Sequence, residues 1–381
     1  MELVTDMQQK LTFDKASLEK QGAYWTATEI CQQPDVWLEA ADNIDKIRSD
    51  VEKFLQPLLS NKNARIILTG AGTSAYVGES IAPHLTKKLD RNIEAISTTN
   101  IVSNPSQYLL KKVPTLLVSY GRSGNSPESL AAVNIANEIV EEIYHLIITC
   151  NENGLLATDS QQYSNSYTVL MPSETQDQSF AMTSSFTSMI VSTLHLFSPD
   201  RVQLEQTAQG VKSWIAKEPN EVKKSLEVGI SRVVFLGSGG LQGFAKEAAL
   251  KILELTAGKI ASFHESALGF RHGPKSLVSN TTEIMLLASA DKYTSLYDLD
   301  LLSELKNDNI AHKLTKLDCG AFGLSTEIED VWAGLGYIVY CQVYAFFMSI
   351  EKGITPDNPC PTGEVNRVVK GVTLYPVSMA S

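Results

Sequence analysis

The stretch RIILTGAGTS at residues 65–74 decides the fold. A short run of β-branched and aliphatic residues stops at a Gly-x-Gly turn, and a helical pattern follows it. The pattern returns as RVVFLGSGGL at residues 232–241, where Gly237 stands 167 residues after Gly70. Strand, glycine turn and helix written twice predict a duplicated α/β unit with parallel sheets, whose carboxyl edges are where ligands collect.

The second strand of each copy ends differently. PTLLVS at 114–119 runs into the serine-rich YGRSGNSPES at 120–129, whereas EIMLLA at 283–288 ends in SADK. Ser126 suits a helix N-cap and Pro127 a first helical turn, so backbone N–H groups and the positive helix end would face a ligand above Ser123 and Ser126. The first copy alone therefore predicts a site for a phosphate monoester.

Composition limits the classes of function. The 381 residues, 43% of them hydrophobic, suffice for two ordinary domains. A net charge of −11 without a basic stripe argues against nucleic acid as a partner. Five scattered cysteines without C-x-x-C spacing argue against a disulfide framework and a zinc site, so no metal is expected. Neither a signal peptide nor an apolar stretch long enough for a membrane is recognised, which predicts a soluble cytoplasmic protein.

Four segments are expected along the chain. Residues 1–45 form an N-terminal arm that is extended up to Pro34 and helical after it. The first α/β domain covers 46–205, and the second covers 206–356. Residues 357–381 are too rich in Pro and Gly for a helix, so they form a tail that crosses the surface over the active site.

The second copy holds acid/base candidates. Glu247, Lys251 and Glu254 recur at i, i+4 and i+7, so they share one helix face, and this spacing fits a solvated ion-pair ladder as well as a chemical role. HESALGFRHGPK at 264–275 places His272 beside Gly-Pro, a fair setting for a general acid or base, with Glu265 as a second carboxylate.

The remaining candidates have competing interpretations. Gly70-x-Gly72 fits a packing turn or a ligand loop, but Thr73 and Ser74 replace the third glycine of a dinucleotide fingerprint, which favours a small phosphate. Arg122 is either a surface residue or a contact to a phosphate or sugar. The polar loop at 172–187 is interpreted as capping and close packing, with backbone contacts to a ligand as the alternative. Four isolated histidines are expected to be structural: His84, His145, His195 and His312.

The loops at 70–74 and 123–126 resemble the sugar isomerase (SIS) domain. Over residues 25–381 the chain is similar to the isomerase half of glucosamine-6-phosphate synthase, and its motifs resemble the AgaS family more specifically. These motifs are EI and QP within 29–34, ESALGFRHGP at 265–274, DNP at 357–359 and GEVNRVVKG at 363–371. The resemblance implies two tandem SIS domains, each a parallel sheet in a flavodoxin-like three-layer α/β/α arrangement.

The resemblance also implies roles. Glu254 moves a proton between carbons 1 and 2 with Lys251 beside it, His272 opens the sugar ring, and Lys370 contacts the open-chain substrate. Members dimerise so that one subunit's histidine enters the other's site, which implies a homodimer or a dimer of dimers. For the phosphate, the resemblance points to Thr73, Ser74, Ser123 and Ser126. With the residues that the sequence pattern itself offers, the expected substrate-binding set is Gly72, Thr73, Ser74, Ser119, Gly121, Arg122, Ser123, Ser126 and Glu265.

The implied activity is cofactor-free conversion of galactosamine 6-phosphate and water to tagatose 6-phosphate and ammonia. The synthase family has Gln and Glu where this chain has Arg122 and Asn125, so the sugar contacts differ. The sequence lacks a glutaminase half, which favours ammonia release. Glucosamine-6-phosphate deamination and tagatose-6-phosphate ketose/aldose isomerisation remain alternatives, and a non-catalytic sugar-phosphate sensor is a third.

Overall fold

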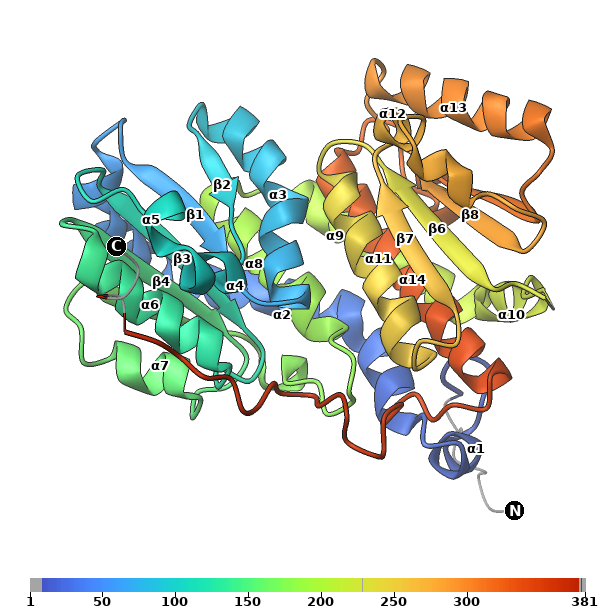
Figure 1. Ribbon diagram of the computed structural model, residues 1–381, viewed down its shortest axis with the longest axis horizontal. Helices are drawn as coiled ribbons and strands as arrows, with labels where there is room; N and C mark the ends of the chain where they lie inside the picture. Colours follow the sequence, from blue (N-terminus) through green and yellow to red (C-terminus); the bar gives the residue numbers. More distant parts are fainter. Residues whose placement is uncertain (1–8, 228, 377, 379–381) are drawn as a thin grey trace. The chain divides into compact units, whose positions relative to one another are not determined.

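The computed structural model describes residues 9–227, 229–376 and 378, which belong to two compact units (Figure 1). The first-sheet unit comprises residues 35–176, 184–204 and the tail from 365 onward. The second-sheet unit comprises 177–183, 205–364 and the described part of 1–34. The units join segments that are distant in the chain, and the four-segment division expected from the sequence stays a prediction.

The first-sheet unit is built on five parallel strands in the order β2-β1-β3-β4-β5, the flavodoxin-like order. Helices α4, α5 and α6 cover one face of the sheet, and α3 and α8 lie on the other. The strands are β1 (Arg65–Thr69), β2 (Ile93–Ala95), β3 (Thr115–Gly121), β4 (Ile143–Thr149) and β5 (Ser166–Leu170). The helices are α3 (Thr73–Leu89), α4 (Thr98–Ser103), α5 (Pro105–Tyr108), α6 (Pro127–Ile139), α7 (Leu155–Ser160) and α8 (Ser184–Phe197).

The second-sheet unit repeats this order with one strand fewer, as β7-β6-β8-β9. Helices α11 and α14 pack on each other, with α11 also against β6 and β7, while α12 and α13 join an apolar cluster with β6 and β8. The strands are β6 (Arg232–Gly237), β7 (Ala261–Glu265), β8 (Thr282–Leu287) and β9 (Lys313–Leu317). The helices include α1 (Lys15–Lys20), α10 (Pro219–Lys224), α11 (Leu241–Leu255), α12 (Ala267–Phe270), α13 (Thr294–Asp308) and α14 (Asp330–Glu351). Two further helices, α2 (Tyr24–Leu59) and α9 (Arg201–Lys217), run from one unit into the other along the chain.

Both glycine turns place the same two demands on the backbone. A Cβ added at Gly70 would meet the backbone of α3 at 2.5 Å, and one added at Gly237 would meet that of α11 at 2.4 Å. Gly72 and Gly239 have φ of +55° and +59°, which a residue with a side chain rarely adopts. Each turn therefore requires glycine twice, for close approach and for the left-handed conformation, as the repeated sequence pattern predicts.

The structure corrects the prediction of an extended N-terminal arm. Residues 24–33 are not extended, because α2 begins at Tyr24 and continues through Pro34. A proline inside a helix leaves the carbonyl four residues earlier without its N–H donor. Here the Gln33 side-chain amide donates to that carbonyl, Ile30 O, at 3.0 Å, and also to Gln342 Oε1 at 2.7 Å. The glutamine side chain thus replaces the hydrogen bond that the proline removes.

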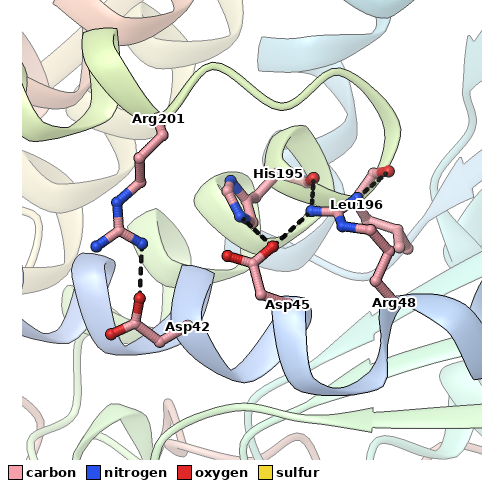
Figure 2. Close-up of polar contacts among 6 residues, drawn as sticks. All are labelled: Asp42, Asp45, Arg48, His195, Leu196 and Arg201. Carbon is pink, nitrogen blue, oxygen red and sulfur yellow. Dashed lines mark hydrogen bonds and ion pairs between the residues drawn. The ribbon is translucent and has the colours of Figure 1, made fainter.

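Polar contacts join α2, α8 and the start of α9 within the first-sheet unit (Figure 2). His195 is buried, and its Nε2 lies 2.9 Å from Asp45 Oδ1. Arg48 donates to the His195 carbonyl at 2.9 Å, and Arg201 pairs with Asp42 at 2.6 Å. These contacts give His195 a structural role, as expected.

Helix α14 differs from the sequence prediction that no stretch is apolar and long enough to span a membrane. By length and composition α14 is apolar enough to cross a membrane, with a mean hydropathy of 1.4. However, 89% of that stretch is buried inside the protein, and α14 packs on α11. This burial is typical of the core helix of a globular protein.

Candidate active site

The first glycine turn sits at the carboxyl end of β1. Gly72 is the N-cap of α3, and Thr73 and Ser74 occupy its first turn, where both are buried. The strand order reverses between β1 and β3, which is where open α/β sheets bind ligands. A 17-residue helix points its positive end at this place. Gly72, Thr73 and Ser74 therefore lie where a phosphate would be stabilised.

The loop after β3 lies beside this turn. The expected cap is confirmed in its positions, because Ser126 is the N-cap of α6 and Pro127 follows in the first turn. The hydroxyl does not cap the helix, however, since Ser126 Oγ donates to Glu128 Oε2 at 2.8 Å. Ser123 Oγ accepts from Asn125 N at 3.2 Å, and Asn151 Nδ2 donates to Ser123 O at 2.9 Å. The loop is thus preformed by its own polar contacts.

Ser119 and Gly121 belong to β3 itself, and Ser119 pairs in register with Thr69 of β1. The hydroxyls of Ser119 and Thr69 are buried without a hydrogen-bond partner in the described part of the chain. A buried unsatisfied hydroxyl costs about 1–3 kcal/mol, so native proteins leave few of them. Two such groups on adjacent strands at this sheet edge are what a site that binds a polar ligand or water would show.

Arg122 is not a surface residue. Only 5% of it is exposed, and its Nη2 donates to the carbonyl of Arg367 in the C-terminal tail at 3.1 Å. Lys370 lies three residues further along that tail and is exposed. Residues 372–376 then line a cavity of about 590 Å³ together with side chains of α4, α5 and α6. The tail that carries Lys370 is therefore fastened to the loop that carries Arg122.

The equivalent turns of the second copy are occupied by the protein's own carboxylates. Asp298 accepts from Ser238 Oγ at 2.6 Å and from Ser289 N at 2.9 Å. Asp330 accepts from Ser289 Oγ at 2.5 Å and from Ala290 N at 2.7 Å. Burial raises the pKa of both carboxyl groups. The donors that these turns present at Ser238, Ser289 and Ala290 are therefore already engaged.

The ion-pair ladder on α11 is not solvated. Glu247 and Lys251 are fully buried, and only Glu254, in the last turn, is partly exposed. Lys251 Nζ lies 3.1 Å from Glu247 Oε1 and also pairs with the Glu254 carboxylate. Burial lowers the pKa of Lys251, but the two carboxylates outweigh it, and the pKa is raised. Lys251 is therefore held as a cation beside Glu254.

The two candidate bases lie at opposite ends of α11. Glu265, at the carboxyl end of β7, accepts from Ser266 N at 2.7 Å and from Gln242 Nε2 at 3.1 Å. Gln242 is in the first turn of α11 and Glu254 in the last, about 18 Å apart at 1.5 Å per residue. A Cβ at Gly269 would meet Glu265 Oε1 at 2.7 Å, so the carboxylate lies directly against this glycine. The second-sheet unit does not bring Glu265 and Glu254 together.

His272 lies on the Glu265 side of this unit. Its N–H donates to the carbonyl of Gly269, 2.9 Å away, and its side chain is exposed. Gly273 follows with φ of +117°, a conformation that requires glycine. Glu265, Gly273 and Pro274 help to line a cavity of about 410 Å³.

Glu29 is a buried carboxyl that sequence reasoning used only as a family marker. It accepts from the Ser179 N–H at 3.1 Å and also from Gln178 N and Ser179 Oγ. Burial and the nearby Asp177 raise its pKa to about 8. Its partners lie about 150 residues away in the chain, so no local spacing signals the contact. The loop at 177–183, for which capping and packing were the favoured interpretation, is held by this carboxyl.

A further cavity is lined by none of the predicted site residues. An apolar cavity of about 320 Å³ in the first-sheet unit is lined mainly by side chains of α2, α3 and α8. Within the described residues, no cluster of three or more His, Cys, Asp or Glu side chains is placed to hold a metal ion.

Comparison with known proteins places the chain in a family. Residues 58–199 match the SIS domain model. The chain is 47% identical to D-galactosamine-6-phosphate deaminase AgaS of Shewanella sp. (strain ANA-3), over 96% of this chain and 95% of that one. It is also 47% identical to the Escherichia coli O157:H7 protein of the same name, over 92% and 96% of the two chains. The crystal structure of tagatose-6-phosphate ketose/aldose isomerase from Escherichia coli superposes with a TM-score of 0.86 at 43% identity, covering 92% of this chain and 96% of that one. The chain therefore contains a SIS domain and belongs to the AgaS family.

Proposed function

We propose that this enzyme converts D-galactosamine 6-phosphate and water to tagatose 6-phosphate and ammonia. The observation that carries the proposal is the 47% identity, over nearly the full length, to proteins named D-galactosamine-6-phosphate deaminase. A solved relative at 43% identity is named for the ketose product of this reaction. Such an enzyme would work in the cytoplasm, where phosphorylated sugars are metabolised.

The phosphate would bind at the first-sheet edge. Thr73, Ser74, Ser123 and Ser126 surround two helix N-termini there, which favour an anion without any added charge. In the second copy, Asp298 and Asp330 take up the equivalent donors. We therefore expect one phosphate per chain, in a tandem arrangement of two SIS domains of which the second has lost its anion site.

The proton transfer would fall to Glu254. The reaction removes a proton from carbon 2 and returns one to carbon 1, so that the aldehyde becomes an alcohol and the amine becomes an imine. Water then adds to the imine carbon and ammonia leaves, with no change in the overall electron count and no need of a cofactor. Lys251, held as a cation beside Glu254, stabilises the negative charge that develops on the enolate. Lys370 would contact the open-chain sugar.

The sites would be shared between two subunits. His272 would open the ring, yet it lies on the Glu265 side of the second-sheet unit, while Glu254 lies at the far end of α11. About 18 Å of helix separates those two ends, which is too far for both groups to act on one sugar. A homodimer, or a dimer of dimers, would supply His272 from the partner subunit. Mixed dimers of Glu254→Gln and His272→Ala should then recover activity far above the residual rate of either variant alone, and no recovery in proven heterodimers would contradict the shared site.

The test of the activity is an ammonia-release assay with the purified chain. D-galactosamine 6-phosphate should give the highest kcat/KM, with D-glucosamine 6-phosphate much slower. Ammonia from glucosamine 6-phosphate alone would transfer the assignment to that epimer. No ammonia from either sugar, with isomerisation of a neutral ketose phosphate, would refute the deaminase, and tight binding without any turnover would indicate a sensor.

A further inference from the structure

The loop that carries His272 is fastened on both sides by one carboxylate. Arg271 precedes His272 and Lys275 follows it by three positions, and both cations pair with Glu304 of α13. Arg271 Nε lies 2.7 Å from Glu304 Oε2, while Lys275 takes the other oxygen, Glu304 Oε1. Glu304 therefore bridges the two sides of the loop with its two oxygens.

Further contacts on α13 strengthen the bridge. Arg271 Nη2 pairs with Asp300 at 2.7 Å, and Lys275 Nζ pairs with Asp308 at 2.5 Å. The three acids recur at i, i+4 and i+8, so they form one stripe along the helix. The hydrogen bonds from Lys275 and Arg271 hold the pKa of Glu304 below its usual range. An isolated surface ion pair contributes little, but a network that shares one carboxylate with an arginine can fix a conformation.

The loop has little else to fix it. Gly273 lacks a side chain and adopts a φ of +117°, and Pro274 has no N–H to donate. The backbone contributes bonds within neighbouring turns: Arg271 N to Leu268 O at 3.3 Å, His272 N to Gly269 O at 2.9 Å, Ser276 N to Gly273 O at 3.0 Å and Val278 N to Lys275 O at 3.0 Å. No hydrogen bond or ion pair of the His272 imidazole is found among the described residues. Its position is therefore set by the backbone at 271–275, and that backbone is anchored through Arg271 and Lys275.

We propose that Glu304 is a positioning residue for His272, which it holds in the orientation that ring opening requires by bridging Arg271 and Lys275. The proposal rests on the ring-opening role given to His272 in the proposed function. Glu304 does not touch the sugar; it acts through the loop. A displacement of a reacting group by about 1 Å can cost about 100-fold in rate, so loss of one anchor of an already constrained loop is expected to cost about tenfold.

The experiment compares Glu304→Gln and Lys275→Gln, each made in the wild-type chain and in the His272→Ala chain. In the wild-type background both variants should lower kcat for the ring-closed sugar about tenfold and leave KM nearly unchanged, because the phosphate site is elsewhere. In the His272→Ala background neither should lower kcat further, because the group they position is gone. Lys306→Gln, which removes an exposed charge from the same helix, is the matched control and should behave as wild type.

The outcomes separate the two claims. Full activity of His272→Ala would refute the ring-opening role on which the proposal rests. An inactive His272→Ala with normal Glu304→Gln and Lys275→Gln would overturn the positioning role alone. Equal losses in both backgrounds would also overturn it, because Glu304 would then act on catalysis by another route. Thermal unfolding shows whether each variant is folded. If Glu304→Gln does not fold, Lys275→Gln provides the test.

Discussion

The side chain of Arg122 donates a hydrogen bond to the main-chain carbonyl of Arg367, 3.1 Å away. The two residues are 245 positions apart, and the contact joins the serine-rich loop to the C-terminal tail. Lys370 follows three residues later in the same segment. We therefore expect phosphate binding at the loop and the placement of Lys370 to be coupled through this arginine.

Arg122→Gln should loosen the tail. Hydrogen bonds from charged donors contribute about 1.5–3 kcal/mol, so amide exchange across residues 365–371 should accelerate by about tenfold or more. Hydrogen–deuterium exchange of that segment is the measurement. Arg201→Gln removes an arginine ion pair elsewhere in the same unit and should leave the tail unchanged. Equal exchange in Arg122→Gln and wild type would show that the tail is held by other contacts.

The serine pair of the loop should set the affinity for the sugar phosphate. Ser123→Ala combined with Ser126→Ala should raise KM about tenfold or more for each charge-assisted hydrogen bond lost. Ser289→Ala is the matched change in the second copy, where Asp298 and Asp330 already take the donors, and it should leave KM unchanged. Initial rates against substrate concentration distinguish the two. A raised KM in Ser289→Ala would place a phosphate at the second turn.

Glu254→Gln should lower the catalytic rate, whereas Glu247→Gln should lower the free energy of unfolding. Removing a positioned general base costs about 100- to 10,000-fold in kcat, so Glu254→Gln should be folded, able to bind substrate and nearly inactive. Glu247 is fully buried against Lys251, and breaking a buried ion pair costs about 3–5 kcal/mol of unfolding free energy. Steady-state kinetics and urea unfolding of both variants give the comparison. An active Glu254→Gln would leave Glu265 as the base.

Glu29 should make the stability of the chain depend on pH. Its pKa is about 8 in the folded state against 4.5 as the reference, so the folded state keeps a proton that the unfolded state has lost between these values. The contribution of Glu29 to the free energy of unfolding should therefore be largest below about pH 4.5 and fall by up to about 1.4 kcal/mol per pH unit until about pH 8.

Glu29→Gln removes this titration and should flatten that slope. Urea unfolding at several pH values between about 5 and 8 tests it. Glu19→Gln, a change at an exposed glutamate of the same unit, should retain the wild-type slope. The same slope in all three proteins would mean that Glu29 is ionised in the folded state.

Local chemistry made much of the fold predictable. The two glycine turns and the pair of Ser126 and Pro127 follow from what a few adjacent residues can adopt, and the structure has them where the sequence indicates. The course of α2 was not predictable in the same way. Pro34 normally signals a helix start, and only the side chain of Gln33, bonded to Ile30 and Gln342, explains why the helix continues.

The parts of the site that the sequence did not predict depend on distant partners. Glu29 and Ser179 are 150 residues apart, and no periodicity joins them. The spacing of Glu247 and Lys251 fits a surface as well as a core, and burial is decided by the packing of α14 on α11. The occupied turn of the second copy could not be predicted from local sequence either. Asp330, which accepts from Ala290 N, belongs to α14 and lies 40 residues further along the chain.

The most direct test of the proposed activity is the product analysis of D-galactosamine 6-phosphate incubated with the purified chain. Nuclear magnetic resonance should show tagatose 6-phosphate and ammonium forming in equal amounts, with neither formed by Glu254→Gln. Conversion of tagatose 6-phosphate to an aldose phosphate, while galactosamine 6-phosphate stays intact and releases no ammonium, would contradict the account.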